Sequence, residues 1–325
     1  MSDSPRTILV TGATGFVGHE VVHQLCADPA RPRLRLLAHA TDVPDCCAAT
    51  ATVVRGGLTD PASLRDVCRD VDTVLHLASV ITEDAATAHA VNTQGTEALL
   101  TEARRSGVRR FVRLSTGAVY GPGPHRGEPR PSDRPLSVTS ASRLAGDRSV
   151  LAAGGVVLRP FLVYGPGDVW VVPSLVRVLT RLPYWIEGGR PRLSLISVGD
   201  LARITAALAT RAAPLPRSAV LHAAHPRPVS VRDLFTTVCR HLDLPLPHRT
   251  VSRAELAARL GAAADPALAP RLLQLREDHW FDGAPLWSLT GLAPGPVFTE
   301  DFAACAPWYR ERLHDVVRAT VPLAG

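Results

Sequence analysis

A glycine-rich loop directly after the first apolar segment is the feature that most restricts how this 325-residue chain can fold. The apolar segment Thr7–Val10 is typical of a buried strand. The sequence TGATGFVG, residues 11–18, follows it and leads into a helical pattern from about Phe16 to Ala27. This order predicts a phosphate-binding turn, because the free amides and the dipole of a helix N-terminus attract anions.

Each glycine of this loop has a separate structural task. Gly12 permits a tight turn out of the strand, Gly15 lets the backbone approach a pyrophosphate, and Gly18 lets the helix pack close to the sheet. We therefore expect a dinucleotide here, although surface turns also use glycine. The loop residues expected at the cofactor are Gly12, Thr14, Gly15, Phe16, Val17 and Gly18.

Strand-like and helical patterns alternate through the first half of the chain. This rhythm predicts an α/β fold, a Rossmann-type doubly wound parallel sheet with right-handed crossovers. Helices are expected from Asp60-Pro61, where aspartate caps and proline takes the first helical position, and over Ala88–Ser106 and Ser140–Ala153. Further strands are expected at Leu34–Ala38, Thr52–Val54, Val71–Leu77, Arg110–Ser115 and Val156–Arg159.

The end of the second expected strand bears on the choice of dinucleotide. An acidic residue there would bind the ribose 2′-hydroxyl, whereas basic residues favour a 2′-phosphate. The chain offers Arg35 and His39, with no carboxylate before Asp42. NADPH is therefore preferred over NADH, the alternative being that both basic side chains face water.

The pattern loosens after Gly165, and all five tryptophans follow it. We expect residues 1–165 to form an NADP(H)-binding Rossmann domain. Residues 166–325 are expected to form a smaller, mostly helical substrate lobe, interleaved with late Rossmann strands such as Ala219–Ala223.

The composition excludes several classes of partner. The chain contains no lysine, and the arginines behind its net charge of +6 are scattered without an aromatic-rich stripe, so no nucleic acid is expected. No apolar run reaches the roughly 18 residues of a membrane span, and the early first strand leaves no room for a signal peptide. Six cysteines without C-x-x-C spacing favour reduced thiols in a cytoplasmic protein. His222 and His225 lack a third ligand, so no metal is expected.

Several short segments resemble the extended short-chain dehydrogenase/reductase superfamily, over most of the chain. Besides TGATGFVG they are RGGLTD (55–60), HLAS (76–79), VNTQGT (91–96), RLSTGAVYG (113–121), LRPFLVYGPG (158–167) and ISVGDLA (196–202). The resemblance implies that Thr116 orients a substrate carbonyl. It also implies cofactor contacts at Leu58, Leu77, Ala78, Ser79, Asn92, Ser115, Pro160, Leu162 and Val163.

Two positions depart from the superfamily's pattern. Gly57 stands where an aspartate normally contacts adenine. The segment PLSVTSASRLAGD, residues 135–147, resembles the part that carries a catalytic tyrosine and lysine, and it assigns Thr139 and Arg143 to those positions. The resemblance therefore leaves Thr116, Thr139 and Arg143 as the catalytic candidates.

The departure at Thr139 removes the usual acid. Hydride delivery to a ketone leaves an alkoxide, which a phenol with a pKa of about 10 can protonate and a threonine hydroxyl cannot. Arg143 can still bind the nicotinamide ribose, as the superfamily's lysine does, but its guanidinium stays charged and cannot shuttle protons.

Three explanations for the missing acid remain. Another residue could replace the tyrosine, with Tyr120, His125 and Asp133 as candidates. A substrate phenol at the position peri to the ketone could supply the proton, since its pKa is about that of tyrosine. Alternatively, redox chemistry has been lost, leaving an isomerase, a cyclase or a dinucleotide-binding regulatory protein.

We favour the substrate phenol, because the chain resembles a group of aromatic-polyketide ketoreductases, from antibiotic biosynthesis, that lack the tyrosine and lysine. The expected partner is then a polycyclic aromatic ketone, with a nucleotide-sugar epimerase or reductase as a further alternative. The excursion Gly121–Arg134 could be a lid over the cleft or disordered filler. Aromatic residues that could stack on a flat substrate, or simply pack in the core, are Trp170, Tyr184, Trp185 and Trp280.

Overall fold

The structure is a computed structural model that describes residues 5–39, 51–128, 131–262, 272 and 274–318. A seven-stranded sheet forms its centre, in the order β12-β7-β5-β4-β1-β2-β3, and every neighbouring pair is parallel. The predicted Rossmann-type α/β fold is thereby confirmed. The strands are β1 Thr7–Thr11, β2 Arg33–Ala38, β3 Ala51–Arg55, β4 Thr73–His76, β5 Arg110–Leu114, β7 Val156–Pro160 and β12 Ala219–Ala223.

The strand order reverses beside β1, since β2 follows it on one side and β4 on the other. Connections leaving the carboxyl ends of β1 and β4 therefore diverge and leave a crevice, which is where doubly wound sheets bind ligands. The glycine loop lies at this point, between β1 and helix α1, Phe16–Cys26.

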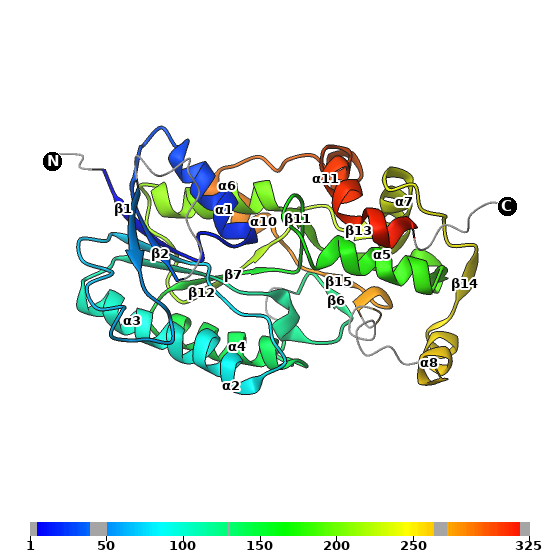
Figure 1. Ribbon diagram of the computed structural model, residues 1–325, viewed down its shortest axis with the longest axis horizontal. Helices are drawn as coiled ribbons and strands as arrows, with labels where there is room; N and C mark the ends of the chain where they lie inside the picture. The colour runs from blue at the N-terminus through cyan, green and yellow to red at the C-terminus, as the bar shows by residue number, and fades with distance from the viewer. Residues whose placement is uncertain (1–4, 40–50, 129–130, 263–271, 273, 319–325) are drawn as a thin grey trace.

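Helices cover both faces of the sheet (Figure 1). One face packs against α1, α6 (Val198–Thr210) and α10 (Ala284–Thr290). The other face packs against α3 (Gly95–Arg105) and α4 (Val138–Ala152). Two apolar cores thus sandwich the sheet, which is why its strands β4 and β7 are buried along their whole length.

Two expected helices differ from the prediction. The segment after Asp60-Pro61 forms consecutive turns, with Asp66 and Asp70 at positive φ, and this left-handed backbone interrupts a helix. The expected helix Ala88–Ser106 is divided into α2 (Ala85–His89), a π-helical turn η2 (Ala90–Gln94) and α3.

The second part of the chain builds a lobe around its own apolar core, with Leu175, Phe235 and Phe302 fully buried at its centre. Its longer elements are the helices α5 (Val171–Arg181), α7 (Val231–His241), α8 (Arg253–Ala262) and α11 (Phe298–Arg318). Short elements complete the structure: β6 His125–Arg126, β8 Leu162–Tyr164, β9 Tyr184–Ile186, β10 Arg192–Leu193, β11 Leu195–Ser197, β13 Val229–Ser230, β14 Arg249–Val251, β15 His279–Trp280, η3 Gly117–Tyr120 and η4 Glu187–Gly189.

Late elements return to the main sheet, since β12 pairs with β7 at its edge while α6 and α10 cover one face. The chain therefore crosses between sheet and lobe several times after residue 165, and Figure 1 shows the lobe beside the carboxyl ends of the strands.

Candidate functional site

The glycine loop forms a cradle in which two positions exclude any side chain. Gly12 has a φ of 72°, and a Cβ placed on it would lie 2.6 Å from the backbone nitrogen of Ala78. A Cβ on Gly18 would overlap the carbonyl oxygen of Gly12. Gly15 caps α1 without a side-chain hydrogen bond to the helix amides. The cradle therefore fits a dinucleotide pyrophosphate, which needs close backbone approach and open amides.

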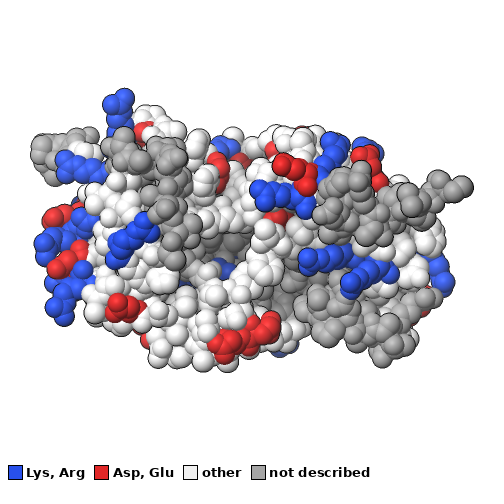
Figure 2. All heavy atoms as spheres, viewed as in Figure 1, with Lys and Arg blue, Asp and Glu red and all other residues white. Residues whose placement is uncertain are grey.

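A cavity of about 390 Å³ extends from this cradle along the carboxyl ends of β4, β5 and β7 to the start of α5. Figure 2 shows the molecule hollowed near the middle of the face that it presents. The cavity brings together these predicted site residues: Gly12, Gly15, Phe16, Val17, Gly18, Leu77, Ser79, Ser115, Thr116, Arg143, Pro160, Leu162, Val163 and Trp170.

The structure places other predicted cofactor residues behind this lining. The Asn92 amide donates to the carbonyl of Val80 and to the Ser142 hydroxyl, and its oxygen accepts from the Val80 amide. Asn92 thereby fixes the loop after β4. Leu58 packs against Gly95, where a Cβ would lie 2.6 Å from the Leu58 Cβ. Outside the described lining lie Thr14, Arg35, His39, Leu58, Ala78 and Asn92.

The two basic residues expected to select NADPH have different environments. Arg35 donates from Nη1 to the carbonyls of Val67 and Arg69, at 3.0 and 2.6 Å, so its guanidinium is held by the turns after Asp60. The expectation that Arg35 favours a 2′-phosphate loses its support. His39 instead lies against Gly57, where a Cβ would be 2.9 Å from the imidazole Cδ2. A side chain at position 57 would therefore displace His39.

Helix α4 carries Thr139 and Arg143, to which the superfamily resemblance assigns the tyrosine and lysine positions. A capping box starts the helix, because the Ser137 hydroxyl accepts from the Ser140 amide and the Ser140 hydroxyl accepts from the Ser137 amide. The i, i+4 spacing of the helix places Thr139, Arg143 and Asp147 along one face.

Thr139 holds the loop after β4 and does not line the cavity. Its hydroxyl donates to the Thr82 carbonyl at 2.9 Å and accepts from the Thr82 amide at 3.0 Å. The one hydroxyl proton is thus engaged with the backbone. At this position the structure supplies a clamp on Thr82 rather than a proton donor.

Arg143 lines the cavity and has an incomplete set of partners. Its Nη2 donates to the Leu114 carbonyl at 3.0 Å, while its Nε is buried and has no hydrogen-bond partner among the described residues. Burial lowers the pKa of Arg143 to about 10, helped by the charge of Arg113 and opposed by Asp147. The group is still protonated at neutral pH.

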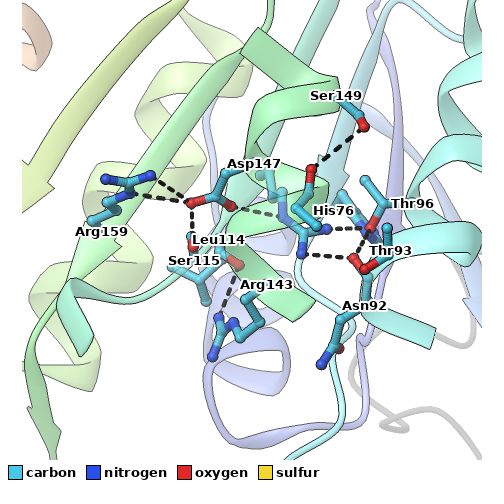
Figure 3. A network of polar contacts seen from close by, with 12 residues as sticks. His76, Asn92, Thr93, Thr96, Leu114, Ser115, Arg143, Asp147, Ser149 and Arg159 are labelled. Carbon is cyan, nitrogen blue, oxygen red and sulfur yellow. Dashed lines mark hydrogen bonds and ion pairs between the residues drawn. The ribbon is translucent and has the colours of Figure 1, made fainter. Parts of the chain in front are cut away.

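Asp147 is the centre of a buried network that the motif comparison did not reveal (Figure 3). Its carboxylate accepts from Arg113 Nε at 3.1 Å, from Arg159 Nη2 at 3.0 Å and from the Ser115 hydroxyl at 2.7 Å. Arg113 also donates to Thr96 and to the backbone. The sequence signals of this network are the arginines inside two buried strands, Arg113 in β5 and Arg159 in β7.

The three alternative acids are all engaged away from the cavity. The Tyr120 hydroxyl lies 2.7 Å from His222 Nε2, and burial raises the pKa of Tyr120. Asp133 pairs with Arg159 at 3.2 Å, and His125 Nε2 lies 3.3 Å from the carbonyl of Gly121. None of the three lines the cavity as described.

Asp168 is the one carboxylate among the described lining residues, and it too is fully engaged. It accepts hydrogen bonds from the amides of Trp170, Val171 and Val172 at the start of α5. It also accepts from the Tyr309 hydroxyl, at 2.9 Å. These four donors hold the carboxylate against the start of α5 and Tyr309.

Of the four aromatic substrate candidates, the described cavity includes only Trp170, which is 55% exposed at its mouth. Trp185 packs in the lobe core with Arg232 over its ring, and Tyr184 contacts His248. Trp280 lies against Gly127, where a Cβ would be 2.7 Å from its Cη2. Trp185 therefore packs in the core, while Tyr184 and Trp280 are partly buried and lie outside the described lining of the cavity.

Phe161 lines the cavity within the segment Pro160–Val163, which the superfamily resemblance places at the nicotinamide through backbone contacts. Its ring stacks on His279 at 5.3 Å with an interplanar angle of 3°. Unpredicted lining residues are Ile81, Leu114, Ala118, Val171 and Gln274.

The excursion Gly121–Arg134 contacts the lobe where it is described. Its strand β6 pairs with β15, and the Arg134 amide donates to the Val119 carbonyl. The Arg134 contact returns the chain to η3, and β6 joins the excursion to the lobe. Residues 129 and 130 lie outside the described part, and the lid remains a hypothesis.

Two general features bear on ligands and location. Within the described residues, no three histidine, cysteine, aspartate or glutamate side chains come together as a metal site. In the same part of the chain, no helix is both long enough and apolar enough to cross a bilayer.

Known proteins resemble this chain over most of its length. A ketoreductase of Stigmatella aurantiaca, named for 4-hydroxy-2-methyl-3-oxo-4-farnesyl-3,4-dihydroquinoline-1-oxide, is 27% identical over 277 residues, which are 81% of each chain. The dTDP-4-dehydrorhamnose reductase of Mycobacterium tuberculosis is 28% identical over 315 residues, 90% of each chain.

Solved structures share the fold at lower identity. MoeE5 in complex with UDP-glucuronic acid and NAD superposes with a TM-score of 0.72 at 24% identity, over 94% of this chain and 100% of MoeE5. The dTDP-glucose 4,6-dehydratase DesIV of Streptomyces venezuelae gives 0.73 at 22%, over 95% of this chain and 98% of DesIV. The profile of one family matches residues 8–221, from β1 to β12. The chain belongs to the NAD dependent epimerase/dehydratase family.

Proposed function

We propose that this protein is an NAD(P)H-dependent ketoreductase that reduces a ketone of an angucyclinone-type aromatic polyketide in antibiotic biosynthesis, using a phenol of the substrate as the proton source. The observation that carries the proposal is the engagement of Thr139. Its hydroxyl is bound to the backbone of Thr82 at the position where the superfamily's acid is expected. Among the described lining residues, Arg143 and Asp168 are the only titratable groups. The Arg143 guanidinium stays protonated at neutral pH, and the Asp168 carboxylate is engaged by three backbone amides and the Tyr309 hydroxyl.

The dinucleotide, when bound, supplies a hydride for the ketone carbon. The glycine cradle would hold its pyrophosphate. Ser115 and Pro160 line the cavity on the side of the catalytic candidates. NADPH is the proposed form, with His39 as the basic residue beside the adenine end and NADH as the less favoured donor.

Thr116 is suited to orient the ketone. Its side-chain oxygen accepts from the Ala118 amide at 3.1 Å, which fixes the hydroxyl while leaving its proton free to donate elsewhere. Because the residue also lines the cavity, the hydroxyl can hydrogen-bond a carbonyl oxygen there. Such a bond positions the substrate but cannot deliver the proton that the new alkoxide needs.

A peri phenol satisfies that need from within the substrate. Its pKa of about 10 matches that of the absent tyrosine, and its internal hydrogen bond already aims the proton at the carbonyl oxygen. The lining supports a flat ligand, since Phe161 lies in the wall and both Ile81 and Trp170 are large apolar groups more than half exposed.

Relatives support ketone reduction at the level of the family. The Stigmatella relative is named as a ketoreductase for a 3-oxo dihydroquinoline. Within the superfamily, the chain resembles the angucyclinone ketoreductase of simocyclinone biosynthesis, and this resemblance rests on the glycine loop together with Thr139 and Arg143.

A second candidate function comes from the sugar enzymes. The relative named dTDP-4-dehydrorhamnose reductase covers 90% of this chain, which favours a nucleotide-sugar reductase or epimerase as the alternative. A sugar ketone carries no phenol, so that function requires an acid from the protein. A non-redox isomerase, a cyclase or a dinucleotide-binding regulator requires no hydride transfer at all.

The test compares two tetracyclic aryl ketones, one with a free peri phenol and one with that phenol methylated, in an assay of NADPH oxidation. We expect turnover of the phenol alone, with both compounds bound at similar affinity. Reduction of both would reveal a protein acid and contradict the proposal. Binding without reduction of either would favour the non-redox alternatives, and deuterium transfer from labelled NADPH would separate a reductase from an isomerase.

A further inference from the structure

The interior beside the cavity holds more cations than anions. The guanidinium groups of Arg113 and Arg159 contact the fully buried carboxylate of Asp147, whereas Arg143, four residues before Asp147 on α4, donates to the Leu114 carbonyl instead. Asp147 is shared by Arg113 and Arg159, and Arg159 also pairs with the partly exposed Asp133. The charge of Arg143 is therefore left without a carboxylate partner.

Neighbouring side chains on the other elements do not offset this charge. His76 on β4 is fully buried between two threonine hydroxyls, and burial lowers its pKa well below the ordinary value, with Arg113 and Arg143 adding to the effect. His76 is therefore neutral. Asp168, across the cavity before α5, is engaged with the amides of that helix and with Tyr309.

The orientation of the Arg143 side chain shows where its unpaired charge can bind a ligand. Figure 3 shows its side chain turned away from Asp147 and toward Leu114, whose carbonyl accepts from Nη2. A guanidinium has five N–H donors, and the buried Nε of Arg143 has no partner within the described residues. A buried cation without a counter-ion is costly, so this site favours an anionic ligand.

We propose that Arg143 forms an anion subsite that binds the phenolate oxygen of a peri-hydroxy aryl ketone. This inference rests on the proposed function and names the group of the substrate that Arg143 recognises. On ionisation the phenol O–H bond breaks and its electron pair stays on the oxygen beside Arg143. In a binding titration the proton goes to solvent, and during reduction it goes to the former carbonyl oxygen. Arg143 thus increases the acidity of the substrate phenol.

The step has a measurable consequence before any turnover. An opposite charge within hydrogen-bonding range lowers the pKa of an acid by roughly 1–3 units. The probe is 1-hydroxyanthraquinone, whose ionisation shifts its absorption to longer wavelength, with 1-methoxyanthraquinone as the non-ionising partner. We expect the pKa of the bound probe to be at least about one unit below that of the free probe, a tenfold increase in the phenolate-to-phenol ratio.

Variants of α4 separate charge from fold. Arg143→Met should return the pKa of the bound probe to its free value or above it, while Arg143→Lys should retain part of the shift. Arg148→Met removes the same charge five residues further along the helix. Its side chain is exposed and lies 3.8 Å from the Asp133 carboxylate, so this variant should leave the shift unchanged. Methoxy-probe affinity should stay the same in all three variants, which confirms a folded cavity.

Each outcome bears on a different conclusion. An unshifted pKa in the native protein, or an equal shift in Arg143→Met, would overturn the anion subsite while leaving the proposed reduction intact. Failure of either probe to bind would overturn both. Turnover of a methylated ketone in the assay above would refute the substrate phenol as acid, even if Arg143 still bound a phenolate.

Discussion

The Thr139 hydroxyl holds both backbone polar groups of Thr82, donating to its carbonyl at 2.9 Å and accepting from its amide at 3.0 Å. This double contact joins α4 to the loop after β4. The superfamily resemblance expects a catalytic tyrosine at this position. In this structure Thr139 has a structural role there, and its hydroxyl does not replace the acidity of a phenol.

Thr139→Ala should therefore affect stability more than catalysis. Two hydrogen bonds are lost and two backbone groups are left partly unpaired, so we expect the free energy of unfolding to fall by about 1–2 kcal/mol in a urea titration. The kcat for a peri-hydroxy ketone should remain within a few-fold of the native value. Thr139→Ser, which keeps the hydroxyl, is the matched control. A hundredfold fall in kcat at unchanged KM would instead assign Thr139 a catalytic role.

Asp147→Asn should destabilise the protein much more than Asp133→Asn. Asp147 is fully buried and serves both Arg113 and Arg159. Its loss leaves the buried Arg113 without a charge partner and Arg159 with only the partly exposed Asp133, at a cost of about 3–5 kcal/mol. Asp133 is partly exposed and screened by water, so its loss should cost less than about 1 kcal/mol. Chemical denaturation of both variants tests this order, and equal losses would contradict it.

His39→Ala should reduce the preference for NADPH, whereas Arg35→Met should not. Arg35 donates to the carbonyls of Val67 and Arg69, so its removal should lower the unfolding temperature with no effect on the cofactor ratio. His39 lies against Gly57 and is the remaining basic group expected near the adenine ribose. The measurement is the ratio of kcat/KM for NADPH over NADH, which should fall several-fold in His39→Ala alone. A fall in Arg35→Met would restore the original expectation for that residue.

Stability should decrease between about pH 6.5 and pH 4 through His222. Burial lowers the pKa of His222 to about 4, helped by the charge of Arg159, from an ordinary value of 6.5. In this interval the unfolded chain binds a proton that the folded protein does not, so acidification favours unfolding by on the order of 3 kcal/mol. His222→Gln should remove that part of the pH dependence in thermal melts at pH 7 and 4.5. An identical pH dependence in the variant would assign the acid sensitivity to other groups.

The sequence predicts most of the main sheet because its signals are local. Apolar runs such as Thr7–Val10 and the glycines of the phosphate loop specify their own backbone, and the structure places β1 and α1 where these patterns indicate. The expected helix after Asp60-Pro61 does not form. The reason is also local, but helix propensity does not predict it. Asp66 adopts a positive φ, which few non-glycine residues do.

The candidate site is less predictable because its groups meet through tertiary contacts. The motif assigned Thr139 and Arg143 to their positions, but the clamp on Thr82 and the sharing of Asp147 by Arg113 depend on where other elements pack. Arg35 shows the same limit, since its partner carbonyls lie more than thirty residues along the chain. A short window of sequence does not show that these distant residues are in contact.

Tyr309 links the last described helix to the rim of the cavity, because its hydroxyl accepts from the Gly165 amide at 2.8 Å and donates to Asp168. Asp168 in turn holds the amides at the start of α5, including that of the lining residue Trp170. Because α11 follows β12 in the chain, a nascent chain can complete its parallel sheet before Tyr309 reaches this rim. The cavity would then take its final form later than the sheet that supports it.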